Sequence, residues 1–348
     1  MNTSRAVNIE DLRRGARRRL PKAVFDYIDG GADREHTLAG NCRAYDDIIF
    51  RPRCAVAVPN YDMRTTVLGT EIAMPIILAP VGSSRMFYPR GEEVAARVAG
   101  SFGTIYTLST LSGCLLEDVK KATTGPAWYQ LYLVGGHDVA RATIARARKA
   151  GYSALVVTID TPVAGMRERD LRNGMKELVT RNPWKMLPHV MQFAVKPHWL
   201  AGFFSDGGLM KFPNVVLPGE GPMLYADVGT ALEASVVTWA DLKWIREAWE
   251  GPIVVKGVHI GDDARRAIDA ARMPSWSRIT AAGNSTMCTR RSGRCRKSWR
   301  RCAARSKCWS MGESAAGATS PRRCASGRAP CSSAAPTPTV SVPQGKPA

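Results

Sequence analysis

Residues that can bind a ligand stand at the ends of five short apolar runs in the first 270 residues of the chain. They are the turn of Pro80, Val81 and Gly82, then Ser109, Gln130 with Tyr132, Thr158 with Asp160, and Lys256. A polar group buried without a partner costs a few kcal/mol, and a buried lysine needs an anion beside it. Five such positions together favour a binding site over five unrelated buried polar groups.

The elements that must position these residues alternate along the chain. Apolar runs rich in β-branched residues are typical of parallel strands covered on both faces, and the segments between them have helical periodicity. The strands are expected at 75–81, 104–109, 128–134, 154–160 and 252–258, and the helices at 92–102, 116–122, 138–151 and 241–251. This order predicts an α/β fold with a parallel sheet, in which the carboxyl ends of the strands form the active site.

The charge of the chain is concentrated in its last part. Residues 1–270 carry a net charge of +5, whereas residues 271–348 carry +14, with 15 Lys and Arg and one acidic residue, Glu313. Six of the nine cysteines also lie after residue 270, without zinc-site spacing. A nucleic-acid partner is therefore not expected. Neither a signal peptide nor a membrane-spanning run is evident, so we expect a cytoplasmic protein.

Seven segments of the first 270 residues resemble, in the same order, the FMN-dependent α-hydroxy-acid dehydrogenase and oxidase family. That family includes flavin-linked L-lactate dehydrogenases, glycolate oxidases and mandelate dehydrogenases. The segments are FDYIDGGADREHTL, MPIILAPVG, GEEVAARVAG, LSTLSGCLLEDV, WYQLYL, GYSALVVTIDTPVAGMRERDLRNGM and TWADLKWIREAWEGPIVVKGVHIGDDARRA. The resemblance implies a (β/α)8 TIM barrel with FMN at the strand carboxyl ends, and intact family members are expected to form homo-oligomers.

The resemblance assigns roles to ten residues of this chain. Lys256 is implied to place a cation near the N1 and C2 carbonyl region of the flavin, where charge tunes the reduced ring. Tyr27 and Arg167 match a pair that binds the substrate carboxylate, for which a guanidinium is suited. Tyr132 matches a catalytic tyrosine that hydrogen-bonds the substrate oxygen. The remaining cofactor contacts are Pro80, Val81 and Gly82 against the flavin ring and Ser109, Gln130 and Thr158 at its polar edge.

Several other features are expected to have no part in the chemistry. The five histidines match no catalytic position of the family, and we interpret them as structural: His36, His137, His189, His198 and His259. No metal site is expected. Residues 166–236 form an insertion after the fourth strand. Within it, 182–213 is aromatic and basic, which fits either a lid on the barrel or peripheral contact with the inner face of the membrane.

Residues 271–348 do not continue the family pattern. The family has there a strand followed by S-N-H-G-G-R-Q-L-D, whose histidine is the base, and later a D-G-G strand end that holds the FMN phosphate. This chain has neither a histidine nor D-G-G after residue 270. Codons for Met273–Cys288 can be chosen so that the neighbouring frame reads D-A-I-V-V-S-N-H-G-G-R-Q-L-D-D-V. We therefore interpret 271–348 as frameshifted translation, with strands six to eight missing or replaced by a disordered basic tail.

Two hypotheses about function follow. The first is FMN-dependent oxidation of an L-2-hydroxy acid, foremost L-lactate to pyruvate, with electrons passed to a quinone or another acceptor. Glycolate and mandelate are alternative substrates, because a single pocket residue such as Leu111 can change the choice. The second hypothesis is that this chain as written is an inactive remnant without the catalytic histidine.

Overall fold

The core of the molecule is a curved sheet of nine strands, seen in a computed structural model. The structure describes residues 6–272, except 47, 51, 58–59, 162–164, 176–183 and 185–186, together with 279–283, 309–310, 318–319 and 322–323. The strand order is β12-β3-β4-β5-β6-β9-β10-β11-β13, and all pairings from β3 to β11 are parallel. The bounds are β3 Ile77–Leu78, β4 Tyr106–Leu108, β5 Ala127–Leu131, β6 Ala154–Thr158, β9 Ile253–Lys256, β10 Ile279–Gly283, β11 Trp309–Ser310, β12 Ala318–Thr319 and β13 Arg322–Arg323.

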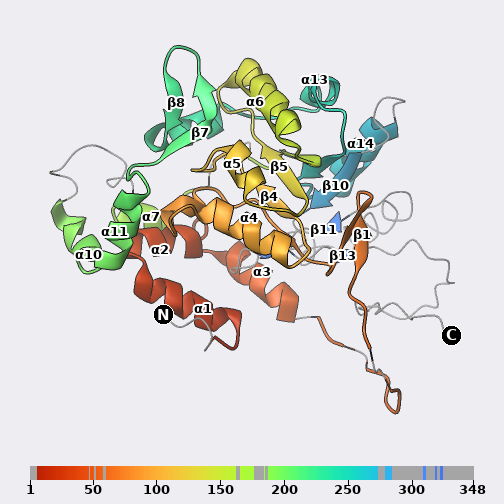
Figure 1. The fold of residues 1–348 in the computed structure, drawn as a ribbon, viewed down its shortest axis with the longest axis horizontal. Coiled ribbons are helices and arrows are strands. Elements are labelled where there is room, and N and C mark those ends of the chain that lie inside the picture. The colour runs from red at the N-terminus through yellow and green to blue at the C-terminus, as the bar shows by residue number, and fades with distance from the viewer. Residues whose placement is uncertain are drawn as a thin grey trace.

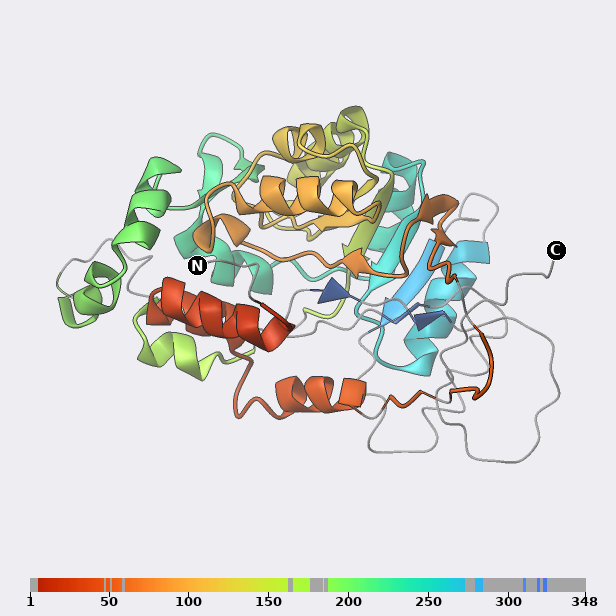
Figure 2. The ribbon, with the colours of Figure 1, turned by 60° about the horizontal axis from the view of Figure 1, so that its bottom comes forward.

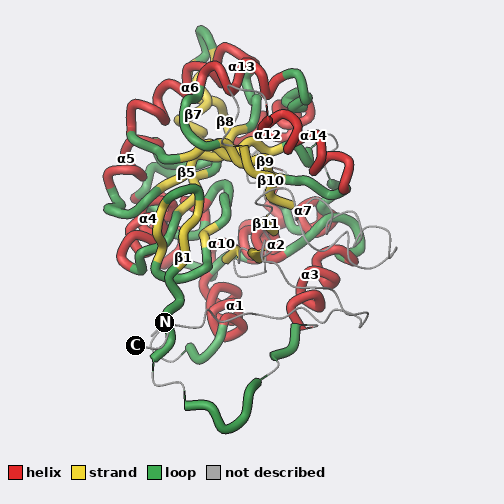
Figure 3. The backbone as a smooth tube through the Cα atoms, turned by 90° about the vertical axis from the view of Figure 1, so that its right-hand side faces the viewer, coloured by secondary structure: helices red, strands yellow, loops and turns green. Residues whose placement is uncertain are grey.

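Helices cover the convex face of this sheet, which Figure 3 shows from one end. They are α4 Gly91–Ser101, α5 Leu116–Lys121, α6 Gly136–Ala150, α13 Asp241–Ala248 and α14 Gly261–Arg272. Leu155, Val157 and Val255 point into the core beneath these helices. The alternate residues Val156 and Val254 point to the concave face, where they pack with Trp128 and other apolar side chains. Thr158 and Lys256 continue that inward series, because successive side chains of a strand alternate between faces.

The five expected strands are all present, and the fold is a TIM barrel of which the sheet forms a curled half. The tail differs from our expectation of disorder at four places. Ile279–Gly283 pairs in parallel with β9, and Trp309–Ser310 pairs in parallel with β10, while β12 and β13 pair antiparallel with β3 and β11. The other residues of 273–348 lie outside the described part of the chain.

Three N-terminal helices lie on the other side of the sheet from α4–α6, as Figure 2 shows. They are α1 Ile9–Arg19, α2 Lys22–Asp29 and α3 His36–Asp46. Asn8 caps α1 because its side chain accepts a hydrogen bond from the Asp11 amide, while the Asp11 carboxylate accepts one from the Asn8 amide. A short antiparallel hairpin, β1 Thr65–Val67 with β2 Thr70–Ile72, precedes the main sheet (Figure 1).

The segment between β6 and β9 folds as a separate layer beside the barrel. It contains α7 Glu168–Arg172, η3 Leu187–His189, α10 Val190–Ala194, α11 Pro197–Ser205, the hairpin of β7 Lys211–Leu217 and β8 Gly221–Leu224, η4 Tyr225–Asp227 and α12 Val228–Glu233. Its buried side chains, among them Trp199, Phe212 and Tyr225, pack with Val24 and Phe25 of α2 in a second core. No helix in the described part of the chain is long and apolar enough to cross a membrane.

Asn214 joins this layer to the barrel. The side chain is fully buried, its Oδ1 accepts a hydrogen bond from the Leu116 amide at 2.9 Å, and its Nδ2 donates to the Cys114 carbonyl at 2.9 Å. The Asn214 carbonyl also accepts a hydrogen bond from the Thr143 hydroxyl at 3.0 Å. The side-chain amide of Asn214, on β7, therefore hydrogen-bonds the backbone at the start of α5, which lies almost 100 residues earlier in the chain.

We expect Asn214→Ala to lower the free energy of unfolding by roughly 1–3 kcal/mol, because it leaves the buried Leu116 N–H without its partner and removes one of the two hydrogen bonds that the Cys114 carbonyl accepts. Urea denaturation followed by tryptophan fluorescence measures this change. Val216→Ala is the control, because Val216 lies on the same strand with its side chain exposed. Equal stability of the two variants would contradict the anchoring role.

Candidate active site

Four polar side chains line the concave face of the sheet at the carboxyl ends of neighbouring strands. Ser109 follows β4, Gln130 lies in β5, Thr158 ends β6, and Lys256 ends β9; all four are buried. The register places Thr158 directly opposite Lys256. The structure therefore brings together Ser109, Gln130 and Thr158, which the family resemblance placed at the polar edge of a flavin, and Lys256, which it placed near the N1 and C2 carbonyl region.

Hydrogen bonds fix the orientation of the Gln130 amide within this group. The Ser109 hydroxyl donates to Gln130 Oε1 at 3.1 Å, and the Thr110 amide donates to the same oxygen at 3.3 Å. On the other side, Gln130 Nε2 donates to Thr158 Oγ1 at 3.1 Å. Since the Thr158 hydroxyl accepts this bond, its own hydrogen can be donated to a ligand, as can the second amide hydrogen of Gln130.

This donor set fits the edge of a flavin ring. That edge carries carbonyl oxygens, which accept hydrogen bonds from a hydroxyl, an amide and an ammonium group. The Thr107 hydroxyl lies on β4, deeper in the sheet than Ser109, and is buried with no hydrogen-bond partner among the described residues. The concave face thus holds more polar groups than its internal hydrogen bonds use.

The turn after β3 completes the ring-facing part of the site. Pro80 is buried, whereas Val81 and Gly82 are half-buried. A side chain at Gly82 would lie 3.5 Å from Leu111 Cβ and 3.8 Å from the Ser109 hydroxyl, so the two loops are in contact. The Ser83 amide also donates to the Leu111 carbonyl at 2.8 Å. Of the three residues expected against the flavin ring, Gly82 therefore lies beside Ser109.

Lys256 forms an ion pair that the sequence did not predict. Its Nζ lies 3.6 Å from Asp160 Oδ2, and both side chains are about one tenth exposed. Gly257 permits this approach, because its φ is +96° and a Cβ there would lie only 2.5 Å from Asp160 Cβ. His259 Nε2 lies 4.0 Å from the same carboxylate oxygen. Asp160 was visible as a polar residue at a strand end, but nothing in the sequence indicated His259 as its neighbour.

Tyr27 and Arg167, expected to bind the substrate carboxylate, are in direct contact. The Arg167 guanidinium carbon lies 4.9 Å from the centre of the Tyr27 ring, and Arg167 also donates to the Tyr27 carbonyl. Arg167 Nε donates to Asp170 at 2.7 Å. The Tyr27 ring stacks near Phe87 and meets Tyr225 edge to face. Burial, and then the charge of Tyr27, raise the pKa of Tyr225 well above its ordinary value, so Tyr225 stays protonated.

Tyr132 directly follows β5 and lies between the flavin-edge residues and the pair of Tyr27 and Arg167. Its amide donates to the Thr110 hydroxyl at 3.0 Å, and that hydroxyl donates to the Gln130 carbonyl at 2.6 Å. The Tyr132 side chain is half-buried and packs against the same core as Tyr27. One threonine therefore fixes the backbone that carries both Gln130 and Tyr132.

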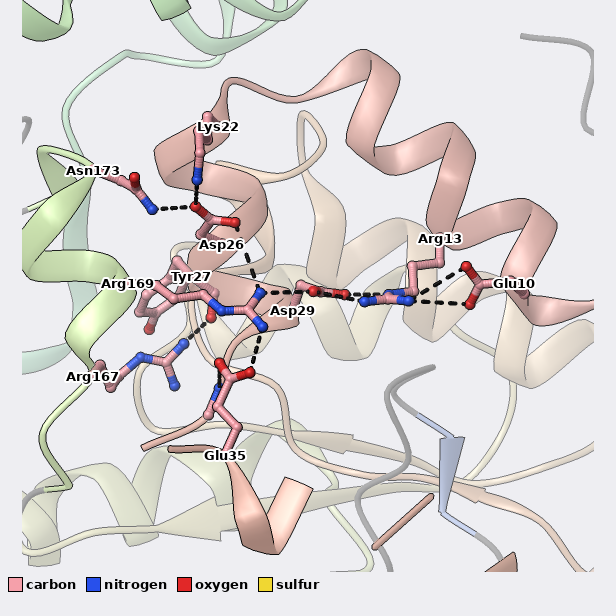
Figure 4. A network of polar contacts seen from close by, with 11 residues as sticks. Glu10, Arg13, Lys22, Asp26, Tyr27, Asp29, Glu35, Arg167, Arg169 and Asn173 are labelled. Carbon is pink, nitrogen blue, oxygen red and sulfur yellow. Dashed lines mark hydrogen bonds and ion pairs between the residues drawn. The ribbon is translucent and has the colours of Figure 1, made fainter. Parts of the chain in front are cut away.

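An ion-pair network between α1, α2 and α7, drawn in Figure 4, holds Tyr27 and Arg167 in place. Arg169 lies 3.1 Å from Asp29 and pairs with Glu35. Asp29 also accepts bonds from Arg13, at 2.5 and 3.0 Å. The Asp29 side chain is only 5% exposed, so two guanidinium groups compensate its burial. Because Tyr27 lies on α2 and Arg167 directly precedes α7, the network sets the distance between them.

A separate cleft of about 490 Å³ lies on the outer side of this network. Residues of α1, α2, α7 and α10 line it, including Arg13, Lys22, Asp29, Arg169 and Gln192. None of the flavin-edge residues is among its lining residues. We therefore place the chemistry at the strand ends and not in this cleft.

The Asp29 network predicts a pH dependence of stability. Burial raises the pKa of Asp29, but hydrogen bonds and charges from Arg13 and Arg169 lower it by more than burial raises it. The pKa of Asp29 therefore lies below its ordinary value. Such a carboxyl stabilises the fold above its unfolded pKa and loses this effect as the pH falls through its folded pKa. We expect the free energy of unfolding to decline below about pH 4, and less steeply in Asp29→Asn.

Denaturation curves between neutral and acidic pH measure this effect. Glu220→Gln is the control, because Glu220 is exposed in the turn between β7 and β8. The role of Asp29 is contradicted if Asp29→Asn and the wild type lose stability equally as the pH falls.

Comparisons with known proteins agree with this geometry. The model of the FMN-dependent dehydrogenase family matches residues 16–272. An L-lactate dehydrogenase of Caulobacter vibrioides is 41% identical over 267 residues, which cover 74% of this chain and 67% of that protein. An L-lactate dehydrogenase of Stenotrophomonas maltophilia is 40% identical over 262 residues, covering 74% and 68%.

Solved structures give the same result for the fold. A monotopic membrane protein, (S)-mandelate dehydrogenase, superposes with a TM-score of 0.69 at 26% identity, covering 80% of this chain and 81% of that one. A mandelate oxidase superposes with a TM-score of 0.61 at 28% identity, covering 79% and 68%. The family match, the relatives and the strand-end residues lead to one conclusion: the chain belongs to the family of FMN-dependent dehydrogenases.

Proposed function

We propose that this chain oxidises an L-2-hydroxy acid to the 2-oxo acid and that L-lactate is its preferred substrate. The observation that carries the proposal is the buried series of Ser109, Gln130, Thr158 and Lys256 on one face of the sheet. The preference for lactate is supported by relatives at about 40% identity that are named L-lactate dehydrogenases.

The residues divide the work of binding between cofactor and substrate. Gln130 and Thr158 donate hydrogen bonds to the flavin edge, and Lys256 supplies a positive charge near it. When bound, FMN accepts the electron pair of the hydroxy acid and passes it to a quinone or another acceptor. Arg167 and Tyr27 bind the substrate carboxylate, and Tyr132 hydrogen-bonds the substrate oxygen.

Leu111 supports a small substrate. It is half-buried, touches the turn at Gly82, and packs against the core that includes Tyr27 and Tyr132. A branched aliphatic side chain at this point takes up space that an aromatic substrate would need. Glycolate and mandelate are the alternative substrates, and mandelate has support from the solved structures of mandelate enzymes.

The alternative to an active enzyme is a remnant that binds substrate groups but does not turn over. It is supported by the absence of any histidine after residue 270. The frameshift interpretation explains that absence, and the repaired frame would supply S-N-H-G-G-R-Q-L-D. Loss of general-base catalysis typically lowers a rate by about 10²–10⁴-fold.

One experiment separates the two. The 348-residue chain and a version with one nucleotide restored after Ala270 and its true downstream sequence are purified and supplied with FMN. Bleaching of the flavin under anaerobic conditions and reduction of a dye are then measured with L-lactate, glycolate and (S)-mandelate. We expect L-lactate to give the highest kcat/KM and Lys256→Met to abolish bleaching, with Lys149→Met as an exposed control. Turnover by the restored chain alone would establish the remnant.

We further propose that the α10–α11 surface lies against a membrane. Leu187, Met191 and Phe204 are about two thirds exposed there. The basic helix α1 is adjacent, since Lys196 donates a hydrogen bond to the Arg18 carbonyl. Exposed apolar side chains next to cationic ones are typical of interfacial attachment, and a solved relative is described as a monotopic membrane protein.

Sedimentation with lipid vesicles tests this attachment. We expect binding to phosphatidylglycerol vesicles to exceed binding to phosphatidylcholine vesicles, and Met191→Asp to weaken it several-fold. Val98→Asp is the control, because Val98 is exposed on α4 among the outer helices. Equal binding of both variants would contradict the membrane contact.

A further inference from the structure

The cleft on the outer side of the Asp29 network has more positive charge than its carboxylates balance. Its volume of about 490 Å³ is in the range of small-molecule sites. In the described part of the chain, six cationic side chains and three carboxylates line it. The cations are Arg13, Arg14, Arg17, Lys22, Arg169 and Lys196, and the carboxylates are Glu10, Asp26 and Asp29. None of these residues binds the flavin or the substrate in the proposed function.

Each of the three carboxylates already has a cationic partner in the cleft wall. The ion pairs are Arg13 with Glu10 and Asp29, Arg169 with Asp29, and Lys22 with Asp26, as Figure 4 shows. Asp26 and Asp29 are also buried, so their charges are compensated by these partners and not by solvent. The carboxylates of the cleft are therefore not available to a cationic ligand.

Two cations of the cleft wall have no carboxylate partner among the residues that the structure describes. Arg17, an exposed residue of α1, forms no ion pair in that part of the chain. Lys196, directly before α11, donates one hydrogen bond to the Arg18 carbonyl, and its ammonium has two more N–H groups to donate. Arg14 pairs with Asp11 on its own helix and adds no excess charge. The cleft is therefore left with two positive charges in excess.

These two charges lie at the same end of the cleft. Because the Lys196 ammonium contacts the backbone of residue 18, it lies beside the turn of α1 that carries Arg17. The guanidinium of Arg17 and the ammonium of Lys196 thus approach the cleft from two different helical segments. An anion with several acceptor oxygens can use both, since donors from different directions need acceptors that point in different directions.

Apolar side chains line the same cleft. Leu20 and Phe25 are buried, whereas Val195, directly after α10, is 61% exposed. The position of α10 is fixed against α2, because Gln192 Oε1 accepts a hydrogen bond from the Ala23 amide at 2.8 Å. A ligand that fills this cleft therefore meets an apolar surface next to the cationic one.

We propose that this cleft binds a phosphate monoester that carries an apolar group. Such a phosphate offers three terminal oxygens and a charge of roughly −1.5 to −2 at neutral pH, which matches the excess charge of Arg17 and Lys196. The apolar group covers Val195 and removes it from water. A phosphatidic acid in a membrane and a soluble phosphate ester share this chemistry.

Calorimetric titration of the full chain tests the site with three probes: phenyl phosphate, inorganic phosphate and dihexanoylphosphatidic acid. We expect phenyl phosphate to bind more tightly than inorganic phosphate, and Arg17→Gln to weaken phenyl phosphate by about five-fold. Arg18→Gln is the matched control, because Arg18 is an exposed neighbour on the same helix whose loss changes the net charge equally, and its side chain does not line the cleft.

A second variant tests the apolar half of the site. Val195→Ser is expected to weaken phenyl phosphate and dihexanoylphosphatidic acid while leaving the affinity for inorganic phosphate unchanged. Both Arg17 and Val195 are exposed, so their variants should melt at the wild-type temperature, which thermal unfolding checks.

The source of the phosphate follows from a third comparison. Sedimentation with vesicles of phosphatidic acid in phosphatidylcholine, reversed by phenyl phosphate and weakened in Arg17→Gln, indicates a membrane lipid. Binding of phenyl phosphate without such sedimentation indicates a soluble ester, and both results support the site. Equal loss of affinity in Arg17→Gln and Arg18→Gln overturns it, because attraction by the overall charge then explains the binding. Failure of all three probes to bind overturns it as well, and neither result bears on the oxidation of hydroxy acids.

Discussion

The ion pair between Lys256 and Asp160 is the interaction on which the strand-end site depends. A buried ammonium is costly unless a carboxylate compensates it, and Asp160 reaches Lys256 only because Thr158 and Lys256 are in register on paired strands. The close approach also requires a glycine at 257. The same carboxylate then faces His259. One pair of charges thus joins the ends of β6 and β9 and brings one carboxylate beside both Lys256 and His259.

The elements of the barrel were predictable because their signal is local. Continuous apolar runs mark strands buried on both faces, and the runs around Tyr106, Gln130, Val156 and Val254 are all strands of the sheet. Chemically distinctive residues that end such runs necessarily meet at one edge of a parallel sheet. That rule predicted that Ser109, Gln130, Thr158 and Lys256 lie together, although it gave neither their hydrogen bonds nor their partners. Their flavin-binding roles come from the family resemblance and stay a prediction.

The contacts that position Tyr27 and Arg167 were not predictable, because they join distant parts of the chain. Arg169 and Asp29 are 140 residues apart, and each is an ordinary charged residue in a charged segment. Nothing in the local pattern distinguishes Arg167, which contacts Tyr27, from Arg172, which pairs with Glu168 in its own helix. The contact of His259 with Asp160 was not predictable for the same reason, because the two residues lie about 100 positions apart and neither local sequence indicates the other.

The tail shows how differently folding and chemistry depend on sequence. Ile279–Gly283 takes the place beside β9, in register from Ile279 opposite Ile253 to Ala282 opposite Lys256. Strand pairing uses backbone N–H and C=O groups, which every non-proline residue supplies, so an unpaired strand edge accepts almost any extended segment. A proton acceptor or a phosphate site instead needs particular side chains, which strand pairing alone does not select. A half-barrel can therefore pair its open strand edge with a segment that departs from the family pattern, whereas the polar side chains at its strand ends depend on the residues of the strands before that segment.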